Sequence, residues 1–285
     1  MRRTLARNLL FVMIALLAAG SSAFAQDAPQ RSIAHIEGDL YRFQNQFHFS
    51  VFLVTRDGII ATDPIDADAA RWLKRELASR FPDRPVRYLI YSHSHADHVS
   101  GGEVFADTAT VVAHEDARRR ILDERVPTAV PDVTFTDRLT VRLGGKTVEL
   151  IHFGPSHTNN LAIMRFPDEG TVFVVDIVAP RRLPYQYLTD ADIDGWIATL
   201  AAIEQLEFDI LAPGHSTVGR KLDIVEQRAY LELLRARVDA GIKAGKPLPE
   251  IKRTVTMDEF SDWGAYGDWR EMNIEGMYRY LLGKD

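Results

Sequence analysis

The chain has 285 residues, of which 46% are hydrophobic and 26% charged, a balance that indicates a folded protein and excludes disorder, collagen and coiled coil. Its formal net charge of −6 argues against a nucleic-acid partner, because phosphate backbones are bound by basic surfaces. It contains no cysteine, so disulfides and a thiol nucleophile are excluded, and any metal must be held by nitrogen and oxygen.

Residues 1–25 predict a secretory signal peptide. Three arginines within the first seven residues precede an apolar run from Leu9 to Ala19, and Ala23-Phe24-Ala25 offers the small residues of a cleavage site. A membrane anchor is the alternative, but this run is well short of the roughly 20 apolar residues that cross a bilayer. We therefore expect a mature chain of residues 26–285 that is periplasmic or secreted and leaves the membrane after cleavage.

The first half of the mature chain predicts short strands alternating with helices. Asp57-Gly58 between two apolar runs indicates a β-hairpin that opens the fold. The expected elements are strands over 51–55 and 59–62, a helix over 66–81, a strand over 86–91, a short helix near 104–105, a strand over 111–113 and a helix over 115–123.

The second half predicts two more hairpins and then helices. The hairpins span 139–153, around Gly144-Gly145, and 161–175, around Pro167-Asp168; a helix, a strand over 210–212 and an amphipathic helix over 224–242 follow. The aromatic tail should pack on the body. No linker or repeat divides residues 26–285, so we expect one domain in which sheets lie between helices.

The polar segment from Ser92 to His98 carries the clearest chemical signal. Here His93, His95 and His98 stand with Asp97 directly after a predicted strand. Imidazole and carboxylate suit zinc-like divalent ions. A polar surface loop is the alternative, but it would require a third of the nine histidines to gather there by chance.

Three further candidates are His157, Asp176 and His215, each of which follows an apolar strand and enters a turn. Function gathers in loops at strand ends. Each residue alone is equally consistent with an ordinary turn, so the signal is the repeated placement.

Together these motifs resemble the metallo-β-lactamase-fold hydrolases from about residue 35 to 245. The resemblance implies an α/β (α+β) fold, a four-layered αβ/βα sandwich, and a metal-dependent hydrolase with two divalent ions, where zinc is expected and iron or manganese are alternatives. It assigns His93, His95 and His157 to one ion, Asp97, His98 and His215 to the other, and Asp176 to the bridge between them.

The resemblance also implies that a metal-bridging hydroxide, oriented by the catalytic Asp97, attacks a small-molecule substrate. Asp176 stands where the best-known lactamases of the family have cysteine, which favours an ester, thioester, lactone or phosphoester, as in glyoxalase II-like enzymes. A metallo-β-lactamase, a mononuclear iron sulfur dioxygenase and a non-catalytic binding module are the alternatives. The oligomeric state stays open.

Other residues carry weaker expectations. Arg181, Arg182 and Tyr185 follow Asp176 and either clamp a substrate carboxylate or form a solvated basic loop. Asp63 is expected to support the segment from Ser92 to His98, here called the metal loop. The remaining histidines are expected to start a helix or support the site (His114), to be structural (His152), or have no assigned place (His35 and His48).

Overall fold

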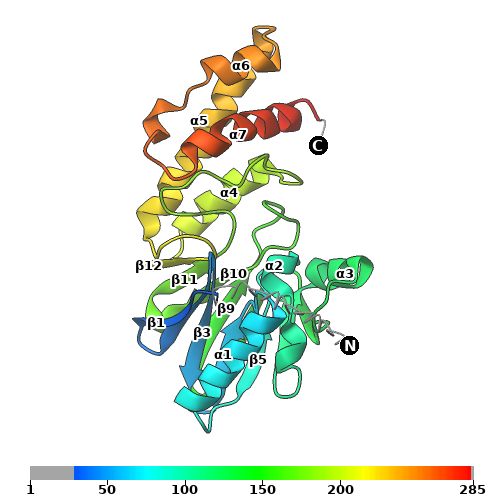
Figure 1. The fold of residues 1–285 in the computed structure, drawn as a ribbon, viewed down its shortest axis with the longest axis vertical. Helices are drawn as coiled ribbons and strands as arrows, with labels where there is room; N and C mark the ends of the chain where they lie inside the picture. The colour runs from blue at the N-terminus through cyan, green and yellow to red at the C-terminus, as the bar shows by residue number, and fades with distance from the viewer. Residues whose placement is uncertain (1–28, 284–285) are drawn as a thin grey trace, which may run out of the picture.

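The structure, a computed structural model, describes residues 29–283 and consists of two β-sheets packed face to face with helices on both outer sides (Figure 1). The predicted signal peptide lies outside the described residues. This arrangement is the four-layered sandwich that the sequence predicts.

The first sheet has seven strands in chain order, antiparallel from β1 to β4 and parallel from β4 to β7. The predicted hairpin around Asp57 is confirmed, because Thr55 pairs with Gly58 across it. The prediction that this hairpin opens the fold is wrong, since two strands precede it. The seven strands are β1 (Arg31–Glu37), β2 (Leu40–Asn45), β3 (His48–Thr55), β4 (Gly58–Thr62), β5 (Val86–Ile90), β6 (Thr110–His114) and β7 (Val133–Phe135).

The second sheet has five strands in the order β12-β11-β10-β9-β8, all antiparallel except β11 with β12. Both predicted hairpins of the second half are confirmed as β8–β9 and β10–β11. The strands are β8 (Arg138–Leu143), β9 (Lys146–Ile151), β10 (Ile163–Phe166), β11 (Thr171–Val174) and β12 (Ile210–Pro213).

Alternation along the strands creates the layers. In β3, Val51 and Leu53 enter the core between the sheets, whereas Phe52 and Val54 enter a second core beneath the helices of the opposite face. That face is covered by α1 (Ala67–Arg80) and α3 (Glu115–Glu124), with the short helices α2 (Ala96–Val99) and η1 (Gly102–Phe105) at its edge. Asp66 caps α1 by accepting hydrogen bonds from two backbone amides of its first turn.

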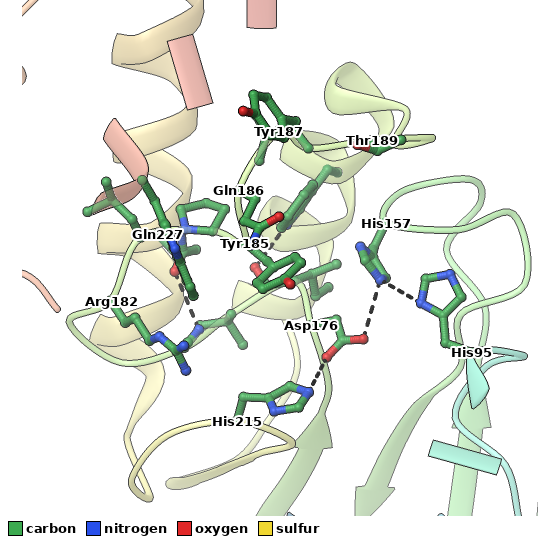
Figure 2. A pocket seen from close by; sticks show the side chains of 18 of the residues that line it. His95, His157, Asp176, Arg182, Tyr185, Gln186, Tyr187, Thr189, His215 and Gln227 are labelled. Carbon is green, nitrogen blue, oxygen red and sulfur yellow. Dashed lines mark hydrogen bonds and ion pairs between the residues drawn. The ribbon is translucent and has the colours of Figure 1, made fainter. Parts of the chain in front are cut away.

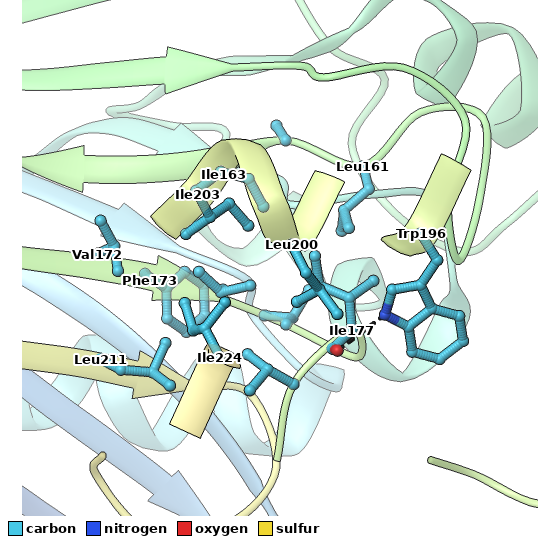
Figure 3. Close-up of a cluster of buried hydrophobic side chains, with 14 of the residues drawn as sticks. Leu161, Ile163, Val172, Phe173, Ile177, Trp196, Leu200, Ile203, Leu211 and Ile224 are labelled. Atoms are coloured by element: carbon cyan, nitrogen blue, oxygen red, sulfur yellow. Dashed lines mark hydrogen bonds between the residues drawn. The ribbon is translucent and has the colours of Figure 1, made fainter. Parts of the chain in front are cut away.

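The outer face of the second sheet packs on α4 (Ile193–Glu204) and α5 (Lys221–Lys243) (Figure 3). Trp196 of α4 packs in this core, and its indole nitrogen donates a hydrogen bond to the Ile177 carbonyl at 2.8 Å. Because Ile177 directly follows Asp176, the core fixes the backbone of a predicted site residue.

The aromatic tail packs on the body, as predicted, and forms η3 (Asp258–Phe260) and the helices α6 (Leu248–Thr254) and α7 (Tyr266–Leu281). Met257, Trp263, Ile274 and Met277 of this tail are buried in the same core as the second sheet. Figure 1 shows α5, α6 and α7 together at one end of the molecule. None of the helices within 29–283 combines the length and hydropathy of a membrane span.

Candidate metal centre and substrate pocket

The loop after β5 brings four of the predicted ligands to one end of the sheets. His93 and His98 are buried, His95 is half-buried, and the side chain of Asp97 is 51% exposed. The loop therefore presents three imidazoles with one carboxylate that is open to solvent.

The second sheet supplies the other three candidates from its strand ends. His157 lies in the loop from β9 to β10, Asp176 lies two residues beyond β11, and His215 lies two residues beyond β12. The backbone of Asp176 has φ = 62°, in the left-handed region, which aspartate tolerates better than most residues. As the sequence predicts, strand ends that are distant in the chain meet at one place (Figure 2).

Four imidazoles surround the carboxylate of Asp176. Its Oδ2 lies 3.2 Å from His93 Nε2, 3.4 Å from His98 Nε2 and 3.3 Å from His157 Nε2. Its Oδ1 lies 3.1 Å from His215 Nε2. The carboxylate is thus shared by two groups of potential ligands, which are His93, His95, His157 and Asp176 on one side and His98, Asp176 and His215 on the other.

In the second group, the Nε2 atoms of His98 and His215 carry free lone pairs when the imidazoles are neutral. His98 Nδ1 lies 3.0 Å from Asp63 Oδ2 and His215 Nδ1 lies 3.1 Å from the Phe47 carbonyl, so both Nδ1 atoms donate. The two Nε2 atoms then face each other at 3.3 Å without protons. Two lone pairs at this distance repel unless a cation lies between them, so these side chains fit a metal ion.

The first group leads to the same conclusion. Ser92 Oγ donates to Asp63 Oδ2 at 2.6 Å, and therefore accepts from His93 Nδ1 at 3.0 Å. His93 Nε2 and Asp176 Oδ1 are buried, and within the described chain neither makes a hydrogen bond of acceptable geometry, although His93 Nε2 lies 3.2 Å from Asp176 Oδ2 and Asp176 Oδ1 lies 3.1 Å from His215 Nε2. Buried polar atoms are normally satisfied, and a bound cation would satisfy both.

The electrostatics of the cluster also favour a cation. Burial lowers the pKa of His93 to about 3 and that of His95 to about 4, so both are neutral ligands at neutral pH. Burial opposes a charge on His98 too, but the Asp176 and Asp63 carboxylates outweigh it and raise the pKa of His98 well above its ordinary value, so in the metal-free protein a proton on His98 Nε2 takes the place that a metal ion would occupy. Burial would raise the pKa of Asp97, but the hydrogen bond from His48 and the charge of His98 hold it below its ordinary range.

Two buried polar side chains hold the metal loop in place. Asp63 accepts from the Ser92 amide at 2.7 Å as well as from Ser92 Oγ and His98, as the sequence predicts for a supporting residue. Asn160, which the sequence does not single out, accepts from the Ser94 amide at 2.9 Å and donates to Ser94 Oγ at 3.2 Å. Both sheets therefore fix the loop.

Arg42 and Gly214 hold the His215 loop. The buried Arg42 guanidinium donates to the carbonyls of Pro213 at 2.8 Å and Ser216 at 2.5 Å. A Cβ on Gly214 would lie 2.7 Å from Val175 Cγ1 and 3.3 Å from His98 Cε1, so only glycine allows this close approach. No sequence motif marks Arg42.

His48, for which the sequence gives no placement, belongs to the site. It begins β3, its Nε2 lies 3.3 Å from Asp97 Oδ2, and its ring centroid lies 4.8 Å from that of His215. Asp97 Oδ2 itself lies 3.8 Å from His98 Nε2 and 3.9 Å from His215 Nε2. His48 therefore orients the exposed carboxylate of the cluster.

A pocket of about 550 Å³ opens over the cluster. The loop after Asp176 forms one wall, and Phe47, Trp196, Gln227 and Trp269 contribute from other elements. Asn273 of α7 clamps this loop, because its amide donates to the Pro184 carbonyl at 3.0 Å and the Gln186 carbonyl at 2.6 Å.

The three residues singled out after Asp176 separate in the structure. Arg181 pairs with Asp262, whereas Arg182 and Tyr185 line the pocket. The rings of His114 and His152 are in contact, tilted by 37° with centroids 4.2 Å apart, and belong to neither ligand group. His114 also caps α3. His114 therefore starts a helix, one of its two predicted roles.

Comparisons with known proteins agree with this geometry. A sequence model of the metallo-beta-lactamase superfamily matches residues 62–215. The chain is 31% identical over 211 residues to 2,4-dinitroanisole O-demethylase subunit alpha of Nocardioides sp., an alignment that covers 72% of this chain and 61% of that one. It is 23% identical over 205 residues to the metallo-beta-lactamase type 2 of Elizabethkingia meningoseptica, covering 68% of this chain and 81% of that one.

A solved structure extends the likeness. The stereoselective inverting sec-alkylsulfatase Pisa1 from Pseudomonas sp. superposes with a TM-score of 0.77 at 16% identity, over 89% of this chain and 50% of the sulfatase. At that identity the likeness concerns the fold. The chain thus spans only about half to three fifths of the demethylase subunit and the sulfatase.

Proposed function

The chain belongs to the metallo-beta-lactamase superfamily, and from this premise we propose that it is a hydrolase that uses two divalent metal ions to cleave an ester-type bond to oxygen or sulfur. One observation carries the proposal. Nε2 atoms of histidines from two ligand groups converge on the single carboxylate of Asp176 at 3.1–3.4 Å. A carboxylate in this position can bridge two ions.

We assign His93, His95 and His157 to one ion and His98, His215 and Asp97 to the other, with Asp176 between them. Bound divalent ions lower the pKa of a coordinated water and polarise the bond to be cleaved, which replaces the serine or cysteine nucleophile of other hydrolases. Zinc suits this set of nitrogen and oxygen ligands, and iron or manganese would use the same atoms.

The protein's own residues position the reaction. Asp97 is the most exposed carboxylate of the cluster, and its Oδ2 is held by His48, so it is the group placed to accept a proton from the attacking water. Asp63 fixes the tautomer of His98. Ile177 and Trp196 form an apolar wall that keeps bulk water from one side of the site.

The names of two similar proteins support an oxygen-linked substrate. The O-demethylase subunit is named for removing a methyl group from the ether oxygen of an anisole, and the alkylsulfatase for acting on an alkyl sulfate, which is an ester, so both names concern a bond to oxygen. We therefore rank carboxylic, sulfuric and phosphoric esters, thioesters and lactones above β-lactams for this chain. Export to the periplasm or beyond remains part of the proposal and depends on residues 1–25.

The test removes and restores the metal. The purified protein is stripped with a strong chelator, reloaded separately with zinc, manganese or iron, and assayed on matched ester, thioester, lactone, sulfate ester, phosphodiester and β-lactam substrates. We expect no turnover when stripped and recovery on reloading. His95→Ala should abolish recovery, whereas His35→Ala, a change at an exposed histidine outside both ligand groups, should not. Full activity in metal-free protein, or a strong preference for the β-lactam, would overturn the proposal.

A further inference from the structure

Arg182 places a cation on the pocket wall with no acidic partner. Its guanidinium lies 4.6 Å from the centroid of the Trp269 ring, and no ion pair or side-chain hydrogen bond involves it within residues 29–283. Burial lowers the pKa of the guanidinium, which nevertheless stays charged at neutral pH. The neighbouring Arg181, by contrast, is exposed and paired with Asp262. A half-buried guanidinium without a carboxylate lacks the partner that such groups normally have.

Gln227 adds a second donor that lacks an acceptor. It lies on α5, is 1% exposed and lines the same pocket. Its Oε1 accepts a hydrogen bond of 3.4 Å from the Ala179 amide, which turns its Nε2 the other way, and this Nε2 has no partner in the described part of the chain. Figure 2 shows Gln227 and Arg182 on the same side of Asp176. Both groups can only donate at these atoms, so they select an acceptor.

The backbone around Arg182 is held rigidly by the C-terminal segment. Leu183 donates to the Gly264 carbonyl at 3.1 Å, and Gly264 donates to the Arg181 carbonyl at 2.8 Å. Trp269, Gln227 and Gly264 all lie outside residues 62–215, the part that matches the superfamily. The C-terminal helices therefore complete this corner of the pocket around Arg182, and none of its residues belongs to a metal-ligand group.

We propose that Arg182 and Gln227 bind an oxyanion group of the substrate, so that the pocket takes amphipathic organic anions. Arg182 supplies the charge and Gln227 an amide hydrogen bond, while Trp269 holds the guanidinium in place by stacking. Val178, Leu183 and Trp196 provide an apolar surface for the body of the ligand. The statement that the bound anion is a substrate rests on the proposed function, whereas binding of the anion does not depend on it.

Carboxylate, sulfonate and sulfate share this chemistry, and two pairs of small probes distinguish planar from tetrahedral anions. Phenylacetate is compared with neutral phenylacetamide, and benzenesulfonate with neutral N,N-dimethylbenzenesulfonamide, which has no acidic N–H with which to bind a metal ion. Their dissociation constants are measured by titration calorimetry on the metal-loaded full chain. We expect at least one anion to bind the wild type roughly tenfold to hundredfold more tightly than its amide, the range of a charge-assisted hydrogen bond.

Variants assign this preference to its residues. Arg182→Gln should remove the preference, Arg182→Lys should keep part of it, and Gln227→Leu should reduce it. The matched control Arg181→Gln should keep it in full, because that side chain pairs with Asp262 away from the pocket. Thermal unfolding checks that each variant is folded.

Three outcomes would overturn the inference. The first is equal binding of anion and amide by the wild type. The second is an Arg182→Gln variant that retains the preference, which would assign anion binding to the metal ions. The third is an Arg181→Gln variant that loses as much of the preference as Arg182→Gln. Binding is read without turnover, so a confirmed preference in a protein that hydrolyses nothing would refute the proposed function and leave this subsite standing.

Discussion

Replacing Asp63 with asparagine should weaken both metal binding and the fold, by comparable free energies. Asp63 is fully buried and accepts three hydrogen bonds, two from Ser92 and one from His98 Nδ1. Asparagine has one acceptor oxygen, so its amide nitrogen must face a donor in either orientation. If the nitrogen faces His98, the imidazole must move its proton to Nε2, and it then has no lone pair for a metal.

The magnitude follows from these contacts. Loss of a carboxylate that orients a ligating histidine costs about tenfold to hundredfold in metal affinity, or about 1.4–2.8 kcal/mol. The unsatisfied buried donor should cost a further 1–3 kcal/mol, roughly, in the free energy of unfolding.

A competition titration against a chelating indicator measures the first cost, and chemical denaturation of the metal-free protein measures the second. Asp66→Ala is the matched control. It removes the α1 cap for about 1 kcal/mol of stability, but no hydrogen bond joins Asp66 to the metal loop, so metal affinity should stay unchanged. The reasoning is refuted if Asp63→Asn binds metal as tightly as the wild type.

Three further predictions concern the bridge, the pocket wall and pH. Asp176→Ala should bind about one ion instead of two and lose most hydrolysis, and two tightly bound ions in that variant would contradict the bridging role. Gly276→Ala should destabilise the protein by about 1–3 kcal/mol and weaken substrate binding, because its Cβ would lie 1.7 Å from the Tyr187 carbonyl oxygen. The control is Gly267→Ala in the same helix, whose Cβ would meet no atom of the described residues within 4 Å. Equal denaturation curves for the two variants would contradict this prediction. Burial lowers the pKa of His114 in the folded protein, so the stability that depends on its neutral form is present above about pH 6.5 and is lost as the pH falls below it. The free energy of unfolding, measured by denaturation at pH 7.5 and at pH 5.5, should therefore fall more in the wild type than in His114→Asn. Equal decreases would contradict the assignment.

That the candidate ligands lie close together could be predicted from sequence, because each one follows an apolar strand. Local alternation marks the strand, and the polar residue just beyond its end is placed at the edge of the sheet. This reasoning finds His157, Asp176 and His215 as well as the loop after β5. It also finds α1, whose cap and apolar face are local features.

The residues that sequence reasoning missed act through contacts between distant segments. Arg42 holds a carbonyl 171 positions away, and Asn160 holds a loop 66 positions away. His48 shows no local pattern, because its partner Asp97 lies in a distant part of the chain, in the loop after β5 of the same sheet. The strand β1 was missed for another reason: it lies at the edge of its sheet with most side chains exposed, so its apolar alternation is weak.

The pocket wall shows the same limit. The sequence indicates only that an aromatic tail packs on the body, whereas α7 uses a buried amide, Asn273, to fix the loop after Asp176. Periodicity cannot reveal which buried polar group will meet which backbone carbonyl, since that depends on how α5 and α7 pack. The distinction between Arg181 and Arg182, adjacent in sequence, likewise appears only in the folded chain.

The most direct test of the central claim is the number of metal ions per chain. The protein is purified, saturated with zinc, freed of excess metal by gel filtration, and analysed for metal and protein by mass spectrometry and amino-acid analysis. The two groups of ligand atoms that share Asp176 predict two ions per chain, falling to about one in Asp176→Ala and unchanged in His35→Ala. A wild-type protein that retains no metal under these conditions would contradict the account. So would an Asp176→Ala variant that retains as many ions per chain as the wild type.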